Sequence, residues 1–241
     1  MKTEFSLANP KDYEISSVEA IRTPRPLFFY EKLLANRERL LEKTGGAAGL
    51  RLMAKTVKSP SLLRLYVEQG VQRFKASSVN EARDALIPAG ASDVLISYPL
   101  LGPHIDDYLD LAEQHPEVRF STLATNRTVA LALSQAAEAR NQPINVFLDI
   151  NPHMHRTGVL FGKPLLELVE TVRDCRFLRL VGLHAYDGHI RHENPRILDR
   201  YAIDLLRLLD ETVQSLSEFD ITIEEVVTSS SLTFAATAAA Y

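Results

Sequence analysis

The segment RLMAKTVKSP, residues 51–60, shows the pattern from which the fold follows. An apolar run from Leu50 to Ala54 is typical of a buried strand, and Lys55 ends it before a helical pattern that reaches Gly70. A strand followed by a helix is the repeating unit of α/β proteins. A lysine at the end of such a strand either extends into solvent or presents an amine to a pocket.

The same unit recurs along the chain. Seven apolar segments have the length of strands, at residues 50–54, 71–77, 93–100, 118–124, 144–150, 180–186 and 223–229. Helical patterns lie before and between them, at residues 31–43, 61–70, 79–90, 104–114, 126–140, 163–174 and 195–216. PLFFY, residues 26–30, indicates an additional leading strand. This alternation predicts a parallel sheet covered by helices.

The kind of sheet follows from where polar residues lie. No G-x-G-x-x-G motif follows any strand, so a dinucleotide-binding sheet lacks its main support. Polar residues instead end several strands: Lys55, Lys75, Asp149, Tyr186 and the run 228–231. We therefore predict a (β/α)8-type TIM barrel, in which that face carries the active site. Because seven strands follow the leading segment, either that segment completes the barrel or the last strand is missing.

Composition excludes several classes of protein. With 241 residues, 46% hydrophobic and 24% charged, the chain is long enough for one large α/β domain. A net charge of −4 gives no basic surface for nucleic acid. There is no signal-peptide pattern, no apolar run of the about 18 residues that a membrane span needs, and only one cysteine, Cys175. The sequence predicts a cytoplasmic protein without a nucleic-acid or membrane partner.

The segment DINPHMHRTGV, residues 149–159, follows a strand and carries Arg156. Arg156 is suited to bind an anionic oxygen of a ligand, or else to form a surface ion pair with a carboxylate such as Asp149. His153 and His155 lack a carboxylate or cysteine partner at helical spacing. We therefore expect no metal site in this segment.

Two further segments offer groups for chemistry on a carbonyl compound. A partly buried lysine has a lowered pKa and attacks aldehydes as the free amine, which is the functional interpretation of Lys55. In GLHAYDGHIRH, residues 182–192, His189 follows Gly188 on a turn, where it can exchange protons near neutral pH. The alternative for this segment is a polar surface loop.

The segment VVTSSSLTF, residues 226–234, runs from the seventh strand into a helix-like start. Hydroxyl groups and backbone N–H groups at such a junction bind phosphate, or else cap the helix. The hydroxyl residues are Thr228, Ser229, Ser230 and Ser231. An amine, a phosphate cradle, an arginine and a tyrosine ring together suit an aldehyde-bearing, phosphorylated cofactor, and pyridoxal phosphate fits all four.

Six segments also resemble, in order, a known family: TPRPLFFYEKLLAN (23–36), LRLMAKTVKSP (50–60), RFKASSVNEA (73–82), DVLISYPLLGP (93–103), MHRTGV (154–159) and GLHAYDGHI (182–190). They resemble the D-threonine aldolase and D-serine dehydratase-like family, which shares the alanine racemase-type barrel of the fold-type III pyridoxal phosphate enzymes. The match covers most of the chain from Thr23 onward.

The resemblance implies a role for each matching residue. Lys55 matches the lysine that forms a Schiff base with the cofactor. Arg156 matches the arginine near the cofactor's phenolate oxygen, and Tyr186 lies where a residue stacks on the pyridine ring. His189 matches the histidine that acts as base in the aldolases. The run 228–231 matches the phosphate loop.

The chain departs from the family pattern at several positions. Leu52 and Met53 replace a usual Pro and His beside the lysine, and Val57 replaces a second His. Serines 229–231 stand where glycines are common, and serine is less suited than glycine to a positive φ. His153 replaces a family Gly. The lysine, arginine and histidine of the site are retained.

The resemblance further implies a lyase that acts on β-hydroxy-D-amino acids, most directly by retro-aldol cleavage of D-threonine to glycine and acetaldehyde. D-serine dehydration, racemisation, a non-catalytic pyridoxal phosphate-binding protein and an inactive fragment are the alternatives. We expect a lead-in at residues 1–22, a barrel at 23–241 and a homodimer. Family members continue into a C-terminal β-domain with metal ligands, for which the sequence has no counterpart. We therefore expect a divalent metal only where such a domain supplies its ligands.

Overall fold

The computed structural model of the chain describes residues 9–240. The first eight residues of the predicted lead-in, and Tyr241, lie outside that range. The chain divides into two compact units, Met1–Glu42 and Lys43–Tyr241.

The first unit contains two short 3-10 turns, η1 (Pro10–Tyr13) and η2 (Val18–Ala20), and the helix α1 (Tyr30–Lys43). The predicted helix at 31–43 is confirmed. The predicted leading strand at 26–30 is wrong, because residues 26–29 have no regular structure and Tyr30 begins α1. Pro24 and Pro26 lack the N–H groups that a strand needs for pairing, which explains the difference.

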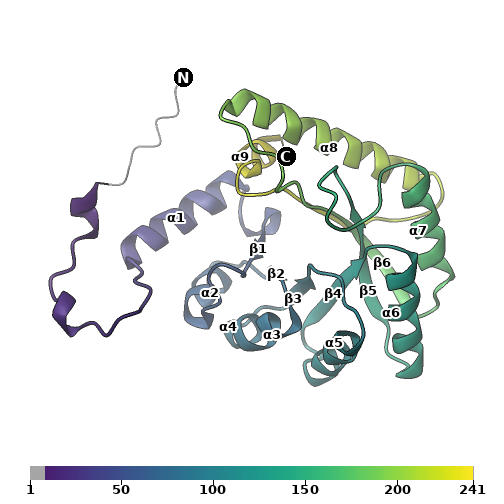
Figure 1. Cartoon of the computed structure of the whole chain (residues 1–241), viewed down its shortest axis with the longest axis horizontal. Helices are drawn as coiled ribbons and strands as arrows, with labels where there is room; N and C mark the ends of the chain where they lie inside the picture. The colour runs from purple at the N-terminus through teal and green to yellow at the C-terminus, as the bar shows by residue number, and fades with distance from the viewer. Residues whose placement is uncertain (1–8, 241) are drawn as a thin grey trace. The chain divides into compact units, whose positions relative to one another are not determined.

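The second unit is built on seven strands: β1 (Arg51–Met53), β2 (Arg73–Ala76), β3 (Asp93–Ile96), β4 (Arg119–Ala124), β5 (Ile144–Ile150), β6 (Leu178–Ala185) and β7 (Glu225–Thr228). All neighbours pair in parallel, in the order β1-β2-β3-β4-β5-β6-β7. All seven predicted strands are therefore confirmed. They form a nearly closed barrel of the TIM type that lacks one strand, as Figure 1 shows.

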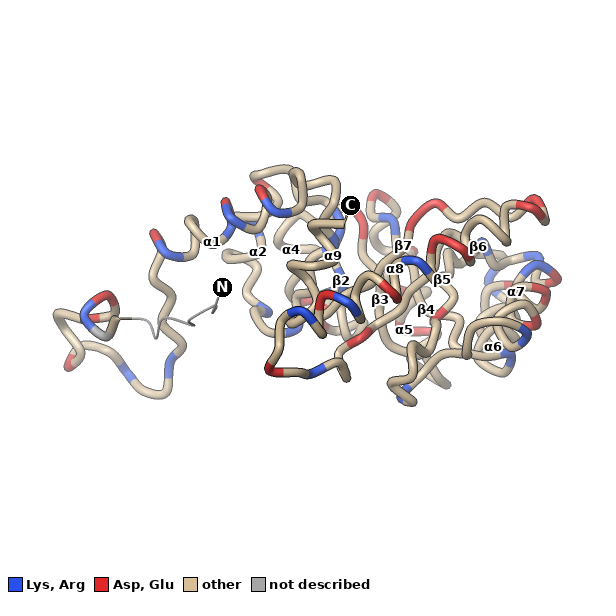
Figure 2. The backbone as a smooth tube through the Cα atoms, turned by 90° about the horizontal axis from the view of Figure 1, so that it is seen from above, with Lys and Arg blue, Asp and Glu red and all other residues tan. Residues whose placement is uncertain are grey.

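Helices connect the strands and cover the outside of the barrel (Figure 1). They are α2 (Pro60–Val67), α3 (Val79–Glu81), α4 (Ile87–Ala89), α5 (Pro103–Gln114), α6 (Arg127–Ala139), α7 (Lys163–Asp174) and α8 (Pro195–Ser217). A further helix, α9 (Phe234–Ala240), follows β7. Figure 2 shows Lys and Arg together with Asp and Glu along α7. Within residues 9–240, no helix is both long and apolar enough to cross a membrane.

The predicted helix at 79–90 has an irregular middle. A π-helical turn, η4 (Ala82–Leu86), separates α3 from α4. Pro88 has no N–H group and its ring crowds the preceding turn, so a widened turn before it is the expected response. The segment ends at Gly90, whose φ of +94° suits glycine.

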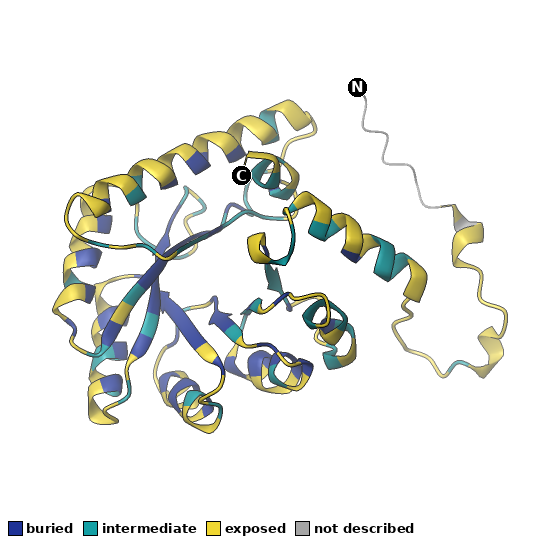
Figure 3. Cartoon of the chain, turned by 180° about the vertical axis from the view of Figure 1, so that it is seen from behind, coloured by how far each residue is buried: buried dark blue, intermediate teal, exposed yellow. Residues whose placement is uncertain are grey.

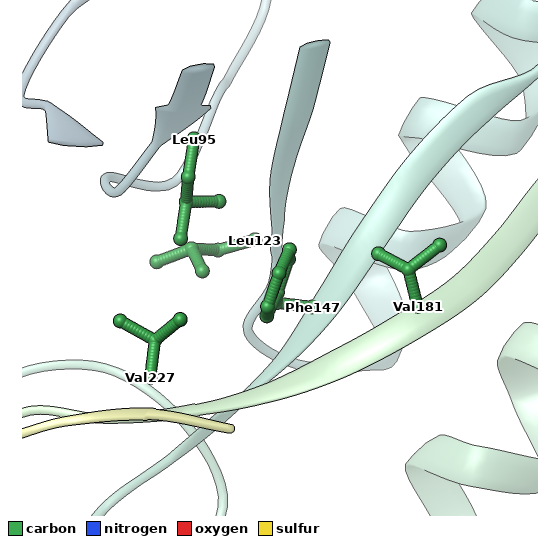
Figure 4. Packing of buried hydrophobic residues seen from close by; sticks show 5 residues of the cluster. All are labelled: Leu95, Leu123, Phe147, Val181 and Val227. Carbon is green, nitrogen blue, oxygen red and sulfur yellow. The ribbon is translucent and has the colours of Figure 1, made fainter. Parts of the chain in front are cut away.

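The centre of the barrel is an apolar layer. The strands are largely buried while the outer faces of the helices are exposed (Figure 3). Inside the barrel, the consecutive strands β3 to β7 each contribute one side chain to a buried cluster: Leu95, Leu123, Phe147, Val181 and Val227 (Figure 4). Such a layer fills a barrel as a packed core rather than a pore.

Below this layer, at the amino ends of the strands, lies a charged floor centred on Arg51. Its Nε and Nη2 donate to the two carboxylate oxygens of Glu225 at 2.7 and 2.6 Å, and its Nη1 donates to Asp93 Oδ1 at 2.8 Å. The Arg51 side chain is only 4% exposed. Because β1 and β7 are the two ends of the sheet order, this guanidinium joins strands that no backbone hydrogen bond joins.

The ionisation of Glu225 responds to this contact. Burial disfavours the carboxylate, but the hydrogen bonds and charge of Arg51 outweigh burial and lower the pKa of Glu225. A lowered pKa means that Glu225 stabilises the folded state above the unfolded-state pKa of about 4.3. This contribution is lost as the pH falls through the lower pKa of the folded state.

Replacement of Arg51 by methionine should lower the free energy of unfolding by about 3–5 kcal/mol, because Glu225 and Asp93 are left as buried charges without their partner. Urea unfolding at pH 7 measures this change.

Arg119 provides the matched control, since it also pairs with acidic residues at the floor but is 43% exposed. Arg119→Met should lower the free energy of unfolding by about 1 kcal/mol or less. Equal losses for the two variants would contradict a special role of Arg51 at the open side of the barrel.

Candidate active site

The carboxyl ends of the strands bring the predicted site residues to the mouth of the barrel. Lys55 lies just beyond β1, after Ala54, whose N–H donates to the carbonyl of Lys75 at 3.0 Å. The N–H groups of Val57 and Lys58 then donate to the Ala54 carbonyl at 2.9 and 3.0 Å and close a turn. Lys55 is exposed, and its ammonium has no hydrogen-bond partner among residues 9–240. The amine is therefore held at the mouth and accessible to a ligand.

Lys75, His184 and Asp149 form a chain of hydrogen bonds inside the barrel. Lys75 Nζ lies 2.9 Å from His184 Nε2, and His184 Nδ1 lies 2.7 Å from Asp149 Oδ1. His184 and Asp149 are 1% and 2% exposed. The second carboxylate oxygen of Asp149 is buried without a hydrogen-bond partner in the described structure.

The protonation of this chain follows from burial and neighbouring charges. Burial, together with the positive charge of Lys75, lowers the pKa of His184 to about 4, although Asp149 opposes the shift. The imidazole is therefore neutral at pH 7. Its proton belongs on Nδ1, which donates to Asp149, so that Nε2 accepts from Lys75.

Lys75 itself titrates near neutral pH. Burial lowers the pKa of Lys75 to about 8, although the charge of Asp149 opposes the shift. The positive charges of Arg51, Arg156 and Lys55 act in the same direction as burial. Lys55 and Lys75 are thus close enough for their charges to interact.

The loop after β5 presents Arg156. Its two ends are joined by hydrogen bonds from the Val159 N–H to Asp149 O at 3.0 Å and from the Asn151 N–H to Val159 O at 2.8 Å. Gly158 has a φ of +87°, and a Cβ there would lie 2.6 Å from the Asp149 carbonyl. Only glycine allows this close return of the chain. His153 and His155 project from the same loop, with ring centroids 6.0 Å apart.

Tyr186 connects this loop to the segment after β6. The guanidinium of Arg156 lies 4.8 Å from the centre of the Tyr186 ring, a cation–π contact, and Lys75 Nζ lies 5.9 Å from the same centre. A Cβ on Gly188 would lie 2.2 Å from atoms of the Tyr186 ring. Tyr186 therefore keeps its position only because residue 188 has no side chain.

Two polar groups beside Tyr186 have unsatisfied atoms. Asp187 is 2% exposed, and its Oδ1 has no hydrogen-bond partner in the described structure. His189 is half-buried, and its Nδ1 is also buried without a partner among those residues. Buried polar atoms in proteins are normally paired, so these are groups that a bound molecule can satisfy.

The run 228–231 leaves β7 and turns toward α9. Thr228 Oγ1 donates to the Ala185 carbonyl at 2.9 Å, and the Ser230 N–H donates to Thr233 Oγ1 at 3.0 Å. Ser229 has a φ of +86°, where serine is strained by about 1–2 kcal/mol. Ser231 is exposed and begins the turn. The role of residues 228–231 as a phosphate loop stays a prediction.

The structure brings Lys55, Arg156, Tyr186 and His189 to one end of one barrel. His184 was missed by the sequence analysis, and Lys75 and Asp149 were noted as strand ends without a role. A detectable signal was present, since Lys75 and His184 interrupt apolar strands at inward-facing positions. Among the described residues, no group of three or more His, Cys, Asp or Glu is placed to hold a metal.

The sequence of this barrel matches a known protein family. Residues 30–240 match the family described as the alanine racemase N-terminal domain, and the chain belongs to it. A search of curated proteins finds no match.

Solved structures refine the comparison. The chain is similar to D-threonine aldolase from Filomicrobium marinum, with 25% identity and a TM-score of 0.74 over 87% of this chain and 55% of that one. It is similar in fold to D-threo-3-hydroxyaspartate dehydratase from Delftia sp. HT23, with 21% identity and a TM-score of 0.80 over 90% and 57%. An alanine racemase-like protein from Idiomarina loihiensis gives 21% identity and a TM-score of 0.75 over 91% and 58%. The chain thus spans little more than half the length of these relatives.

Replacement of Gly188 by alanine should displace the Tyr186 ring and separate it from Arg156, because the added methyl group overlaps that ring. The near-ultraviolet circular dichroism of the tyrosine should change while the far-ultraviolet spectrum is kept. Gly162→Ala is the control for an added methyl group, since the space around its Cβ position is open; its φ of +82° makes it the harsher change for the backbone. An unchanged tyrosine signal in Gly188→Ala would argue against this packing.

Proposed function

We propose that the barrel binds pyridoxal phosphate and is part of an enzyme that acts on β-hydroxy-D-amino acids. The leading reaction is retro-aldol cleavage of D-threonine to glycine and acetaldehyde. The observation that carries the proposal is the accessible Lys55 amine at the mouth of a barrel that also holds Arg156, Tyr186 and His189. Membership of the alanine racemase N-terminal domain family and the likeness to a D-threonine aldolase support it.

The residues present fit this cofactor. Its aldehyde needs an unpaired amine, and Lys55 has one. Its anionic oxygens need a cation, which Arg156 provides beside the Tyr186 ring. A protonated pyridine nitrogen needs a hydrogen-bond acceptor, and Asp149 and Asp187 each have a buried carboxylate oxygen without a partner in the described structure. The phosphate is assigned to Thr228, Ser229, Ser230 and Ser231.

The roles of the chain's own groups follow from their positions. Lys55 holds the cofactor, and Tyr186 offers a ring surface beside Arg156. His189 has an unpaired ring nitrogen, so it is the group that accepts the proton of the substrate's β-hydroxyl. When bound, pyridoxal phosphate supplies the electron sink that such bond cleavage needs.

Reconstitution with pyridoxal phosphate should produce the visible absorbance of a lysine-bound cofactor. Borohydride reduction followed by peptide mass spectrometry should place the label on Lys55. Lys55→Ala should lose both the absorbance and the label, since Lys75, the other amine of this pocket, is held by His184 Nε2 at 2.9 Å. Lys58→Ala is the matched control, because Lys58 is exposed three residues further along and should leave both readouts unchanged. Labelling of another lysine in the wild-type protein would overturn the assignment.

Product analysis of the loaded protein then identifies the reaction. Acetaldehyde and glycine from D-threonine indicate the aldolase, whereas a keto acid and ammonia from D-serine indicate the dehydratase. Interconversion of enantiomers indicates a racemase, and cofactor binding without any product indicates a binding protein. Each assay is run with and without added Mn²⁺ or Zn²⁺, and sedimentation tests the proposed homodimer. His189→Gln should slow aldehyde release by about 10²–10⁴-fold while cofactor labelling is kept.

A further inference from the structure

The unused hydrogen-bonding capacity of Lys75 points to a second ligand contact in this pocket. An ammonium group has three N–H donors. Lys75 Nζ makes one hydrogen bond, to His184 Nε2 at 2.9 Å, and has no second hydrogen-bond partner in the described part of the chain. Two donors of a partly buried cation are therefore left for something other than these residues.

The position of this cation is fixed from behind. His184 is 1% exposed, and its other nitrogen is held by Asp149 at 2.7 Å. The neutral imidazole of His184 carries no charge of its own, but its two hydrogen bonds fix the distance between Lys75 and Asp149. Lys75 Nζ is thus held in one position, 5.9 Å from the centre of the Tyr186 ring. The guanidinium of Arg156 lies over the same ring.

The charged and titratable groups that face Lys75 come from five parts of the barrel. They are Arg51 on β1, Lys55 after β1, Asp149 on β5, Arg156 after β5, and the titratable His184 and Tyr186 of the β6 segment. Arg51 is already paired with Glu225 and Asp93 at the floor. At the mouth, three cationic side chains stand against two carboxylates, so the pocket favours a ligand with negative charge: Lys55, Lys75 and Arg156 against Asp149 and Asp187. A neutral ligand would leave these charges uncompensated.

We propose that Lys75 is an anion-binding residue of the site, whose ammonium donates hydrogen bonds to an anionic oxygen of the bound cofactor or of the amino-acid substrate. This inference rests on the proposed function, since it names a further residue that would hold the same ligands. It assigns the His184–Asp149 pair the task of positioning Lys75.

A pH dependence follows from this role. The pKa of Lys75 is lowered to about 8, chiefly by burial, so the free protein keeps the ammonium below pH 8 and loses it above. A bound anion favours the charged form and raises this pKa. Binding therefore takes up a proton near pH 8, and affinity falls as the pH rises through 8.

Two stable probes separate the sources of the anionic oxygen. Pyridoxine phosphate has the phenol and the phosphate but no aldehyde, so it cannot condense with Lys55. The reduced adduct N-phosphopyridoxyl-glycine adds a carboxylate. Isothermal titration gives the Kd of each probe at pH 7 and pH 9.5 for the wild-type protein, Lys75→Met and Lys75→Arg.

For the probe that carries the contacted oxygen, Lys75→Met should weaken binding about tenfold to a hundredfold at pH 7, the value of a charged hydrogen bond. The ratio of the two Kd values should fall to about fourfold or less at pH 9.5, because Lys75 of the free wild-type protein is then neutral and must take up a proton to bind the anion. Lys75→Arg stays charged, so its affinity should change less with pH than that of the wild type. A ratio of the Kd of Lys75→Met to that of the wild type near one at pH 7, for both probes, would overturn the inference.

A second measurement follows the protonation of Lys75 in the wild-type protein and uses a substitution only to assign the signal. In protein labelled with ¹³C at lysine Cε, one signal should titrate with a pKa of about 8, and Lys75→Arg should remove it. A saturating probe should raise this pKa in the wild-type protein; no change with either probe would overturn the inference. If the wild-type protein binds neither probe nor pyridoxal phosphate itself, both this inference and the proposed function are overturned. If it binds them tightly and substitution of Lys75 leaves the Kd unchanged, only the role of Lys75 is rejected.

Discussion

The barrel depends on one guanidinium. Arg51 begins β1 and donates to Glu225 at the start of β7 and to Asp93 at the start of β3. The sheet order leaves β1 and β7 without a common backbone hydrogen bond, so the floor network replaces a strand pairing with side-chain contacts. Such contacts are directional, because a bidentate arginine–carboxylate pair holds both partners in one geometry.

The same residue also acts on the site. The Arg51 guanidinium lies 5.7 Å from the centre of the Phe147 ring, within the apolar layer that separates the floor from the mouth. Its charge reaches across that layer and contributes to the lowered pKa of Lys75. Charges interact over longer distances in a weakly polarisable core than in water. The cation that joins the two ends of the sheet therefore also helps to make a lysine of the pocket lose its proton near pH 8.

Much of this fold was predictable because its signals are local. Each strand is a short apolar run followed by a helix, and all seven were predicted from that pattern. The leading strand failed because PLFFY is apolar, whereas strand pairing needs N–H groups, which Pro26 in this segment and Pro24 before it lack. The position of Lys55 at the mouth was predicted from its place at a strand end. The Lys75–His184–Asp149 chain was not predicted, because its members are 109 and 35 residues apart in sequence and only the barrel brings them into contact.

The two lysines of the mouth differ in a way that suits two tasks. Lys55 is exposed and has no hydrogen-bond partner among residues 9–240, so its amine can change bonding partner without loss of a protein contact. Lys75 is held by a buried imidazole that a carboxylate orients, so its position is fixed while its proton is labile. A residue that must form and break a covalent bond needs freedom, whereas a residue that recognises charge needs preorganisation. We therefore propose that the same type of side chain serves both tasks, and that its surroundings in the barrel decide which one it performs.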